Sequence, residues 1–189
     1  MLILNRQVNL ARPTSKQGFS AVFIILLLIG IGLYFYDPYE KARLARDKKR
    51  VENIQNLKKA IEAYLQNNKL QEISMCDGCS LGKDVFAMSS INLGQSVSAR
   101  VVDSSAVNIT GWVPVDFSLN AKIGATPIKN LPLDPLNVDP YVYTYTPGQG
   151  RTYKLSAALE SSQNDSLEKE DKGVNESRYE IGTGLTLPP

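Results

Sequence analysis

The stretch that decides the fold is FSAVFIILLLIGIGLYFY, which runs from Phe19 to Tyr36. Its 18 residues include no charged side chain. As a helix rising roughly 1.5 Å per residue they would be about 27 Å long, close to the hydrocarbon thickness of a bilayer. The alternative, a buried core helix, would have to be apolar on every face within a small domain. We therefore predict a transmembrane helix over residues 19–36.

Charge is unevenly distributed along the chain. The 189 residues are 43% hydrophobic, which argues against a disordered chain. Their formal net charge is only +2, which argues against a nucleic-acid binder that works by bulk charge. Residues 1–60 hold 11 basic and four acidic side chains, whereas residues 61–189 hold 10 and 15. This asymmetry indicates a basic, membrane-associated end and an acidic, exposed domain.

The residues before the apolar run form a basic leader. Residues 1–18 contain three basic residues and no acidic one, and they end in Gly18. A secretory signal peptide begins in the same way, but its apolar segment is usually shorter and a small-residue cleavage site follows it. Asp37-Pro38-Tyr39 offers no such site after the run, so cleavage beyond the run is not expected.

The junction Lys16-Gln17-Gly18-Phe19-Ser20 resembles the class III signal of type IV pilins and type II secretion pseudopilins. The resemblance implies that a prepilin peptidase cuts after Gly18 and methylates the new N-terminal Phe19. It also implies that the apolar helix packs with other pilin or pseudopilin subunits, delivered from the lipid bilayer by an inner-membrane assembly platform. The head would then lie outside the cytoplasm, anchored by one span of the inner membrane before assembly and on a surface filament or pseudopilus afterwards.

One residue departs from the family's pattern. Pilins usually carry Glu at the fifth position of the mature chain, and counting from Phe19 this sequence has Phe23 there. A carboxylate inside a membrane is costly and is kept mainly where it has a partner. Its absence removes a specific docking element, and family members without it tend to be minor or tip subunits. The resemblance therefore favours a minor subunit.

The apolar run is followed by an amphipathic stem over residues 37–68. Asp37-Pro38 permits a bend, after which an apolar stripe predicts a helix over Tyr39–Asn68. Its basic residues are either a patch for anionic lipid or nucleic acid, or the solvated face of a helix leaving the membrane. More basic residues follow the span than precede it, where there are three. By the positive-inside rule this count would keep the head in the cytoplasm. The resemblance favours the opposite orientation, with the head outside. The cluster comprises Lys41, Arg43, Arg46, Lys48, Lys49 and Arg50.

Residues 69–189 have the pattern of a globular, β-rich head. Short extended segments separated by turn residues predict a small antiparallel sheet, and a long helix packed on it gives an α+β, pilin-like fold. A mobile polar loop is expected at 161–178, and Trp112 is expected in the core between strands. The candidate strands are Val97–Val102, Trp112–Val115, Tyr141–Tyr145, Tyr153–Leu159 and Tyr179–Gly182.

A second resemblance lies in the head. Pseudopilins often show a Pro-x-Asp-Pro-x-Asn stretch before a Tyr-rich hairpin whose second strand ends in Leu-Glu, and Pro132–Asn137 and Leu159-Glu160 match that pattern. Asp134, Asn137 and Asp139 offer hard oxygen ligands that would suit calcium if backbone carbonyls completed the shell. Asx-Pro turns explain the same residues without a metal.

Cys76 and Cys79 are the two cysteines of the chain, in C-x-x-C spacing. A redox motif of this spacing would need a βαβ context. A zinc site would need two more strong ligands. A disulfide in an exported domain is the simpler interpretation, with free thiols as the alternative. Histidine is absent, and no nucleophile elbow, phosphate loop or catalytic carboxylate pair stands out, so an enzyme is not expected.

Three hypotheses follow for the function. The first is a structural subunit of a type IV pilus or type II secretion pseudopilus, assembled through its apolar helix. The second is a single-pass, signal-anchored surface protein that binds a partner and never polymerises. The third is a cytoplasm-facing membrane protein whose basic helix binds lipid or DNA.

Processing at Gly18 separates the first two hypotheses. We expect the protein purified from its native cells to begin at methylated Phe19, and Gly18→Leu to retain the leader because the peptidase site is lost. Intact mass and N-terminal sequencing check both points. A native chain that still begins at Met1 would contradict the filament hypothesis.

Overall fold

The structure is a computed structural model that describes residues 15–35, 37–67, 75–76, 78–93, 98–118 and 128–188. Within α1, side chains are described at Ser20 and over residues 22–32. The chain divides into two compact units, Met1–Lys41 and Ala42–Pro189. The fold is α+β.

The first unit contains α1, a helix over Ser15–Phe35. Gly18 and Phe19 both lie in it, so the described part of the predicted leader is helical. In the parts of the chain that the structure describes, no helix meets the length and apolarity required of a membrane span.

The helical run is interrupted where proline predicted a bend. The second helix, α2, runs over Pro38–Asn67, and Asp37 caps it by accepting hydrogen bonds from the backbone N–H groups of Tyr39 and Glu40 at 2.9 and 3.0 Å. Pro38 takes the first helical position, where a missing N–H costs nothing. The helix predicted over Tyr39–Asn68 is thus confirmed to within one residue at each end.

The second unit is built on a five-stranded sheet in the order β2-β1-β3-β4-β5. β1 pairs with β2 in parallel, and the other neighbours are antiparallel. The sheet is therefore mixed, and the prediction of a purely antiparallel sheet was wrong. The strands are Asp84–Ala87 (β1), Ser98–Val101 (β2), Thr144–Pro147 (β3), Tyr153–Ala157 (β4) and Tyr179–Gly182 (β5).

One strand prediction failed and another is shifted along the chain. Trp112–Val115 is an irregular buried loop in which the Trp112 indole N–H donates to the Pro132 carbonyl at 3.2 Å. Its apolar residues are inside, as expected, but they pack without joining the sheet. The strand predicted over Tyr141–Tyr145 begins later in the structure, at Thr144. Strand β1 was not predicted, because its four residues are too few to give a recognisable pattern.

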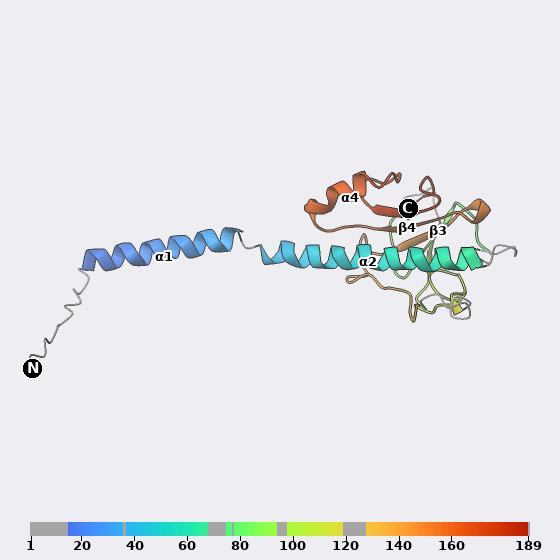
Figure 1. Cartoon of the computed structure of the whole chain (residues 1–189), viewed down its shortest axis with the longest axis horizontal. Coiled ribbons are helices and arrows are strands. Elements are labelled where there is room, and N and C mark those ends of the chain that lie inside the picture. Colours follow the sequence, from blue (N-terminus) through green and yellow to red (C-terminus); the bar gives the residue numbers. More distant parts are fainter. Residues whose placement is uncertain are drawn as a thin grey trace, which may run out of the picture. The chain divides into compact units, whose positions relative to one another are not determined.

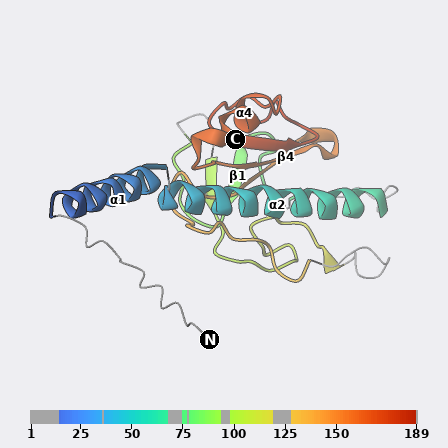
Figure 2. The same ribbon diagram turned by 60° about the vertical axis from the view of Figure 1, so that its left-hand side comes forward.

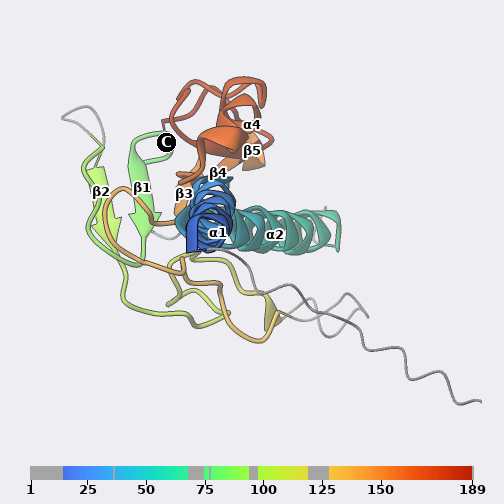
Figure 3. The same cartoon turned by 90° about the vertical axis from the view of Figure 1, so that its left-hand side faces the viewer.

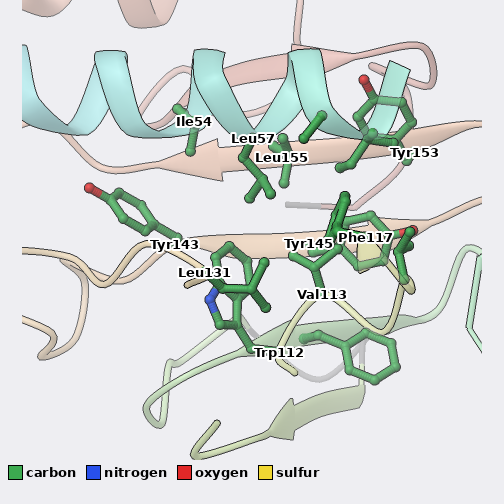
Figure 4. Close-up of a cluster of buried hydrophobic side chains, with 14 of the residues drawn as sticks. Ile54, Leu57, Trp112, Val113, Phe117, Leu131, Tyr143, Tyr145, Tyr153 and Leu155 are labelled. Carbon is green, nitrogen blue, oxygen red and sulfur yellow. The ribbon is translucent and has the colours of Figure 1, made fainter. Parts of the chain in front are cut away.

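One face of the sheet carries the hydrophobic core. α2 runs alongside β3 and β4 (Figures 1 and 2), and end-on it lies on the same side of the sheet as the loop that follows β2 (Figure 3). Leu57 of α2 points toward Leu155 of β4, and Trp112 fills the space beside Tyr143 (Figure 4). The buried α2 side chains Ile54, Leu57, Ile61 and Tyr64 all belong to the apolar stripe read from the sequence.

The opposite face is buried and polar. Lys154 and Glu180 are 1% and 0% exposed, and their Nζ and Oε1 atoms lie 2.7 Å apart. Val174 and Asn175 donate backbone N–H groups to Glu180 Oε2 at 2.7 and 3.2 Å. Burial lowers the pKa of Lys154, and the Glu180 carboxylate opposes that shift. The 171–175 turn is thus held onto the sheet by buried charge.

The polar segment 161–178 is more regular than predicted. A 3-10 turn, η2, covers Ser162–Asn164, and a short helix, α4, covers Asp165–Lys169. A further 3-10 turn, η1, covers Gln149–Arg151 between β3 and β4. Ser161 caps η2 by accepting the Gln163 backbone N–H at 3.2 Å, and the mobility expected for the segment stays a prediction.

Leu57→Ala tests the packing of α2 on the sheet. Leu57 is 0% exposed, so we expect the substitution to lower the free energy of unfolding by about 2–5 kcal/mol through lost burial and a residual cavity. Urea unfolding followed by the fluorescence of the single, buried Trp112 measures it. Ile109→Ala, at a side chain 65% exposed, is the control and should change little; equal losses would contradict the packing.

Candidate functional site

The described apolar side chains of α1 are exposed all around the helix. From Val22 to Ile31 they are between 46% and 68% exposed, and Phe23 has the highest value. Successive residues of a helix point about 100° apart, so these side chains cover every face. An apolar surface of this extent on a protein normally marks a region that another molecule covers.

Gly30 and Gly32 lie within this surface. Among the described residues, and apart from the helix's own backbone, no atom lies within 4 Å of where a Cβ would stand at either position. Small residues on an apolar helix allow a second helix to approach closely.

A buried ion cluster joins α2 to the head. Arg50 is 0% exposed. Its Nε and Nη2 donate to the two oxygens of Asp134 at 2.7 and 3.0 Å, and its Nη1 donates to Asp47 at 2.8 Å and also to Glu160. Arg46 donates to Glu160 through Nε at 2.7 Å and again through Nη2. Two turns of α2 thereby hold two segments of the head that are far away in sequence.

Asp47 completes the cluster from the helix side. Its carboxylate accepts the backbone N–H groups of Glu160 and Ser161, each at 2.9 Å, and the side-chain amide of Asn164 at 2.8 Å. The chain leaving β4 is therefore fixed to α2 by both its backbone and its side chain. Charge-assisted hydrogen bonds of this kind are stronger than neutral ones.

The cluster favours the ionised forms of Glu160 and Arg50. Arg46 holds the pKa of Glu160 below its ordinary value through a hydrogen bond; burial opposes this shift and Arg50 adds to it. Burial alone would lower the pKa of Arg50, but the hydrogen bonds that it donates to Asp134 and Glu160 outweigh burial and raise that pKa. The Arg50 guanidinium also lies 4.9 Å from the centre of the Tyr141 ring, a cation–π distance.

The basic stem cluster therefore has two parts. Arg46 and Arg50 point inward to carboxylates, whereas Lys48 and Lys49 are exposed. The interpretation of the whole cluster as a solvated face was wrong for the two arginines. Asp134 and Glu160, which carry the second resemblance, are their partners, and the sequence showed no direct signal of that pairing.

Two of the residues considered for calcium already accept hydrogen bonds from other parts of the chain. Both Asp134 oxygens bind Arg50, and Asp134 also accepts the Leu136 N–H at 2.9 Å, whereas Asp139 accepts the Asn92 N–H at 3.1 Å. Asn137 adopts a positive φ of 50° in the turn. No group of three His, Cys, Asp or Glu side chains able to hold a metal occurs within the described residues. Calcium binding by this loop remains a prediction, at a site where the Asp134 charge is already compensated.

Cys76 and Cys79 lie next to each other in the head. The structure joins them with their Cα atoms 6.0 Å apart, a separation typical of a disulfide. Cys76 belongs to the hydrophobic core, and the neighbouring Met75 carbonyl accepts the buried Tyr145 hydroxyl at 3.0 Å. The oxidation of Cys76 and Cys79 to a disulfide in the protein stays a prediction.

The comparisons give no family for this chain: no protein-family model, curated protein or solved structure matches it.

Glu160→Gln tests the ion cluster through pH. The folded-state pKa of Glu160 is depressed, so its contribution is complete above its unfolded pKa of about 4.3 and is lost as pH falls through the folded value. At neutral pH we expect the variant to lose roughly 1–3 kcal/mol of unfolding free energy, and the gap to wild type to shrink below about pH 4. Urea unfolding across pH measures the gap.

Glu62→Gln is the matched control for that measurement. Glu62 lies 3.6 Å from Lys58 on the exposed side of α2, and such surface pairs contribute little. A pH-independent gap for Glu160→Gln, or an equal loss in both variants, would show that the cluster does not act as described.

Proposed function

We propose that this protein is a structural subunit of a type IV pilus or of a type II secretion pseudopilus. In this proposal the basic leader is removed after Gly18, and the chain that begins at Phe19 assembles through α1. The observation that carries it is the exposure of the described apolar side chains, Val22 to Ile31, on every face of α1. A helix with no polar face needs lipid or other helices around it.

In this proposal α1 is surrounded first by lipid and later by helices of other subunits. The precursor would hold its apolar segment in the inner membrane, with the head outside the cytoplasm. On assembly, α1 would exchange lipid for the equivalent helices of neighbouring subunits. Since lipid tails are as apolar as leucine, close packing drives this exchange, and Gly30 and Gly32 offer positions where a neighbour can approach.

The ion cluster suits this role because it fixes the head to its stem. A filament subunit must transmit load between the packed helix and the exposed head. Arg46, Asp47 and Arg50 hold the head segments at Asp134 and Glu160 with several charge-assisted hydrogen bonds. Several such contacts must break together before the head separates from α2.

A minor position in the filament is the more specific proposal. Phe23 stands where the family usually carries Glu, so this chain lacks the carboxylate thought to meet a neighbour's N-terminal amine. Its side chain is 68% exposed and offers apolar contact in place of a charge. The rival proposal, a signal-anchored surface protein that does not polymerise, uses the same helix but retains its leader.

Photo-cross-linking in native cells tests the proposal. With a photoreactive amino acid at Leu28, which is 61% exposed, we expect covalent products that join this chain to other pilin-like subunits, because the helix would be surrounded by theirs. Gly18→Leu in the same background is the control, since it blocks leader removal without changing the apolar helix. Equal products in both chains, or none in either, would favour the anchored protein.

A further inference from the structure

The head contains a small hollow that neither α1 nor the ion cluster uses. It has a volume of about 280 Å³ and lies where four segments meet: residues 91–93, residues 139–141, residues 158–159, and Asn175 with Ser177 and Arg178. Its lining mixes apolar side chains such as Ile91 and Leu159 with polar ones such as Asn92 and Ser177. Ligand sites of small molecules combine an apolar wall with a few convergent polar groups in this way.

The walls of the hollow are held in place by hydrogen bonds. The Asn92 N–H donates to Asp139 at 3.1 Å and the Arg178 N–H donates to the Asn175 carbonyl at 3.1 Å. Asn175 in turn accepts the Ser177 N–H at 3.0 Å. A site built before its ligand arrives avoids much of the ordering cost of binding.

Arg178 supplies an unusual buried cation at this site. It is 4% exposed, and its hydrogen bonds within the described residues go to neutral oxygens: Ser156 Oγ at 2.7 Å, Pro140 O at 3.0 Å and Val142 O at 2.6 Å. Burial lowers its pKa to about 10, so it stays charged at neutral pH. Arg50 and Lys154, by contrast, each bind a carboxylate.

The charges around the hollow restrict what it would take. Among the described lining residues, Arg178 and Asp139 are the charged ones, one of each sign. An ion of either sign would be repelled by one of them and would lose its hydration on entry. A neutral polyol avoids that repulsion, and its hydroxyl groups can donate hydrogen bonds to the Asp139 carboxylate. Pro140 and Tyr141 offer an apolar wall for the C–H face of a sugar ring.

We propose that this hollow binds a single neutral sugar residue of a glycan, with Asp139 accepting hydroxyl protons and Ser177 and Asn175 providing further hydrogen bonds. The head would then recognise a carbohydrate surface, a role that the assembly function does not include. Tyr141 connects the hollow with the ion cluster, because it lines the hollow and its ring also packs against Arg50 of the cluster.

Titration of the full chain with methyl glycosides tests this site. The protein is kept in the zwitterionic detergent lauryldimethylamine oxide, since a maltoside detergent would itself present sugar, and saturation-transfer NMR detects binding of the methyl glycosides of glucose, galactose and N-acetylglucosamine. We expect at least one to bind saturably, and Asp139→Asn to raise its dissociation constant about tenfold, because a charge-assisted hydrogen bond becomes a neutral one.

Asp165→Asn is the matched control. Asp165 is an exposed acid on α4, outside the hollow, paired with Lys169 at 3.5 Å, so its variant should bind like wild type. The proposal is overturned if no glycoside saturates, if the two variants bind alike, or if acetate or methyl phosphate saturates the hollow when no glycoside does. Thermal unfolding of each variant confirms that it is folded. Binding is measured on the dispersed chain, so its outcome is independent of filament assembly.

Discussion

The rest of the second unit depends on how the Arg50 guanidinium is buried. A fully buried arginine is stable only when carboxylates and hydrogen bonds surround it, and here Asp47, Asp134 and Glu160 all converge on it. The partners at 134 and 160 are 84 and 110 residues away in sequence. The carboxylates that surround the Arg50 side chain therefore fix two distant segments against the same part of α2. These segments are the loop before β3 and the residues that follow β4.

The two units bury their apolar residues in different ways. In the second unit, the apolar stripe of α2 is covered by β3, β4 and the loop that contains Trp112. In the first, the described residues of α1 remain exposed on all sides. The chain thus packs α2 into its own core and leaves the described side chains of α1 exposed. This suits a subunit in which other molecules cover α1. This contrast is the physical basis of the proposed assembly role.

The sheet is also unusual in having two buried faces of opposite character. Tyr145 and Leu155 face the hydrophobic core, whereas Lys154 and Glu180 form an ion pair on the other side. Alternation along β4 explains both, because successive side chains point to opposite faces. Gly173 is required next to this pair, since a Cβ there would lie 1.9 Å from Glu180 Oε2. The polar 171–175 turn can cover a sheet face because buried charge holds it in place of apolar contacts.

The sequence by itself determined the features that depend on neighbours along the chain. These are the uncharged helix, the interruption at Pro38, the apolar stripe of α2, strand β5 and the close cysteine pair, and each follows from spacing or from a local backbone constraint. Only the tertiary structure decided that β2 runs parallel to β1, that Trp112 sits in a buried loop, and that Arg46 and Arg50 turn inward. It also decided that Asp134 meets an arginine and that Arg178 and Asp139 border one hollow. The reason is that an arginine on a helix looks the same in sequence whether water or a distant carboxylate satisfies it, and only the folded chain brings that carboxylate within reach.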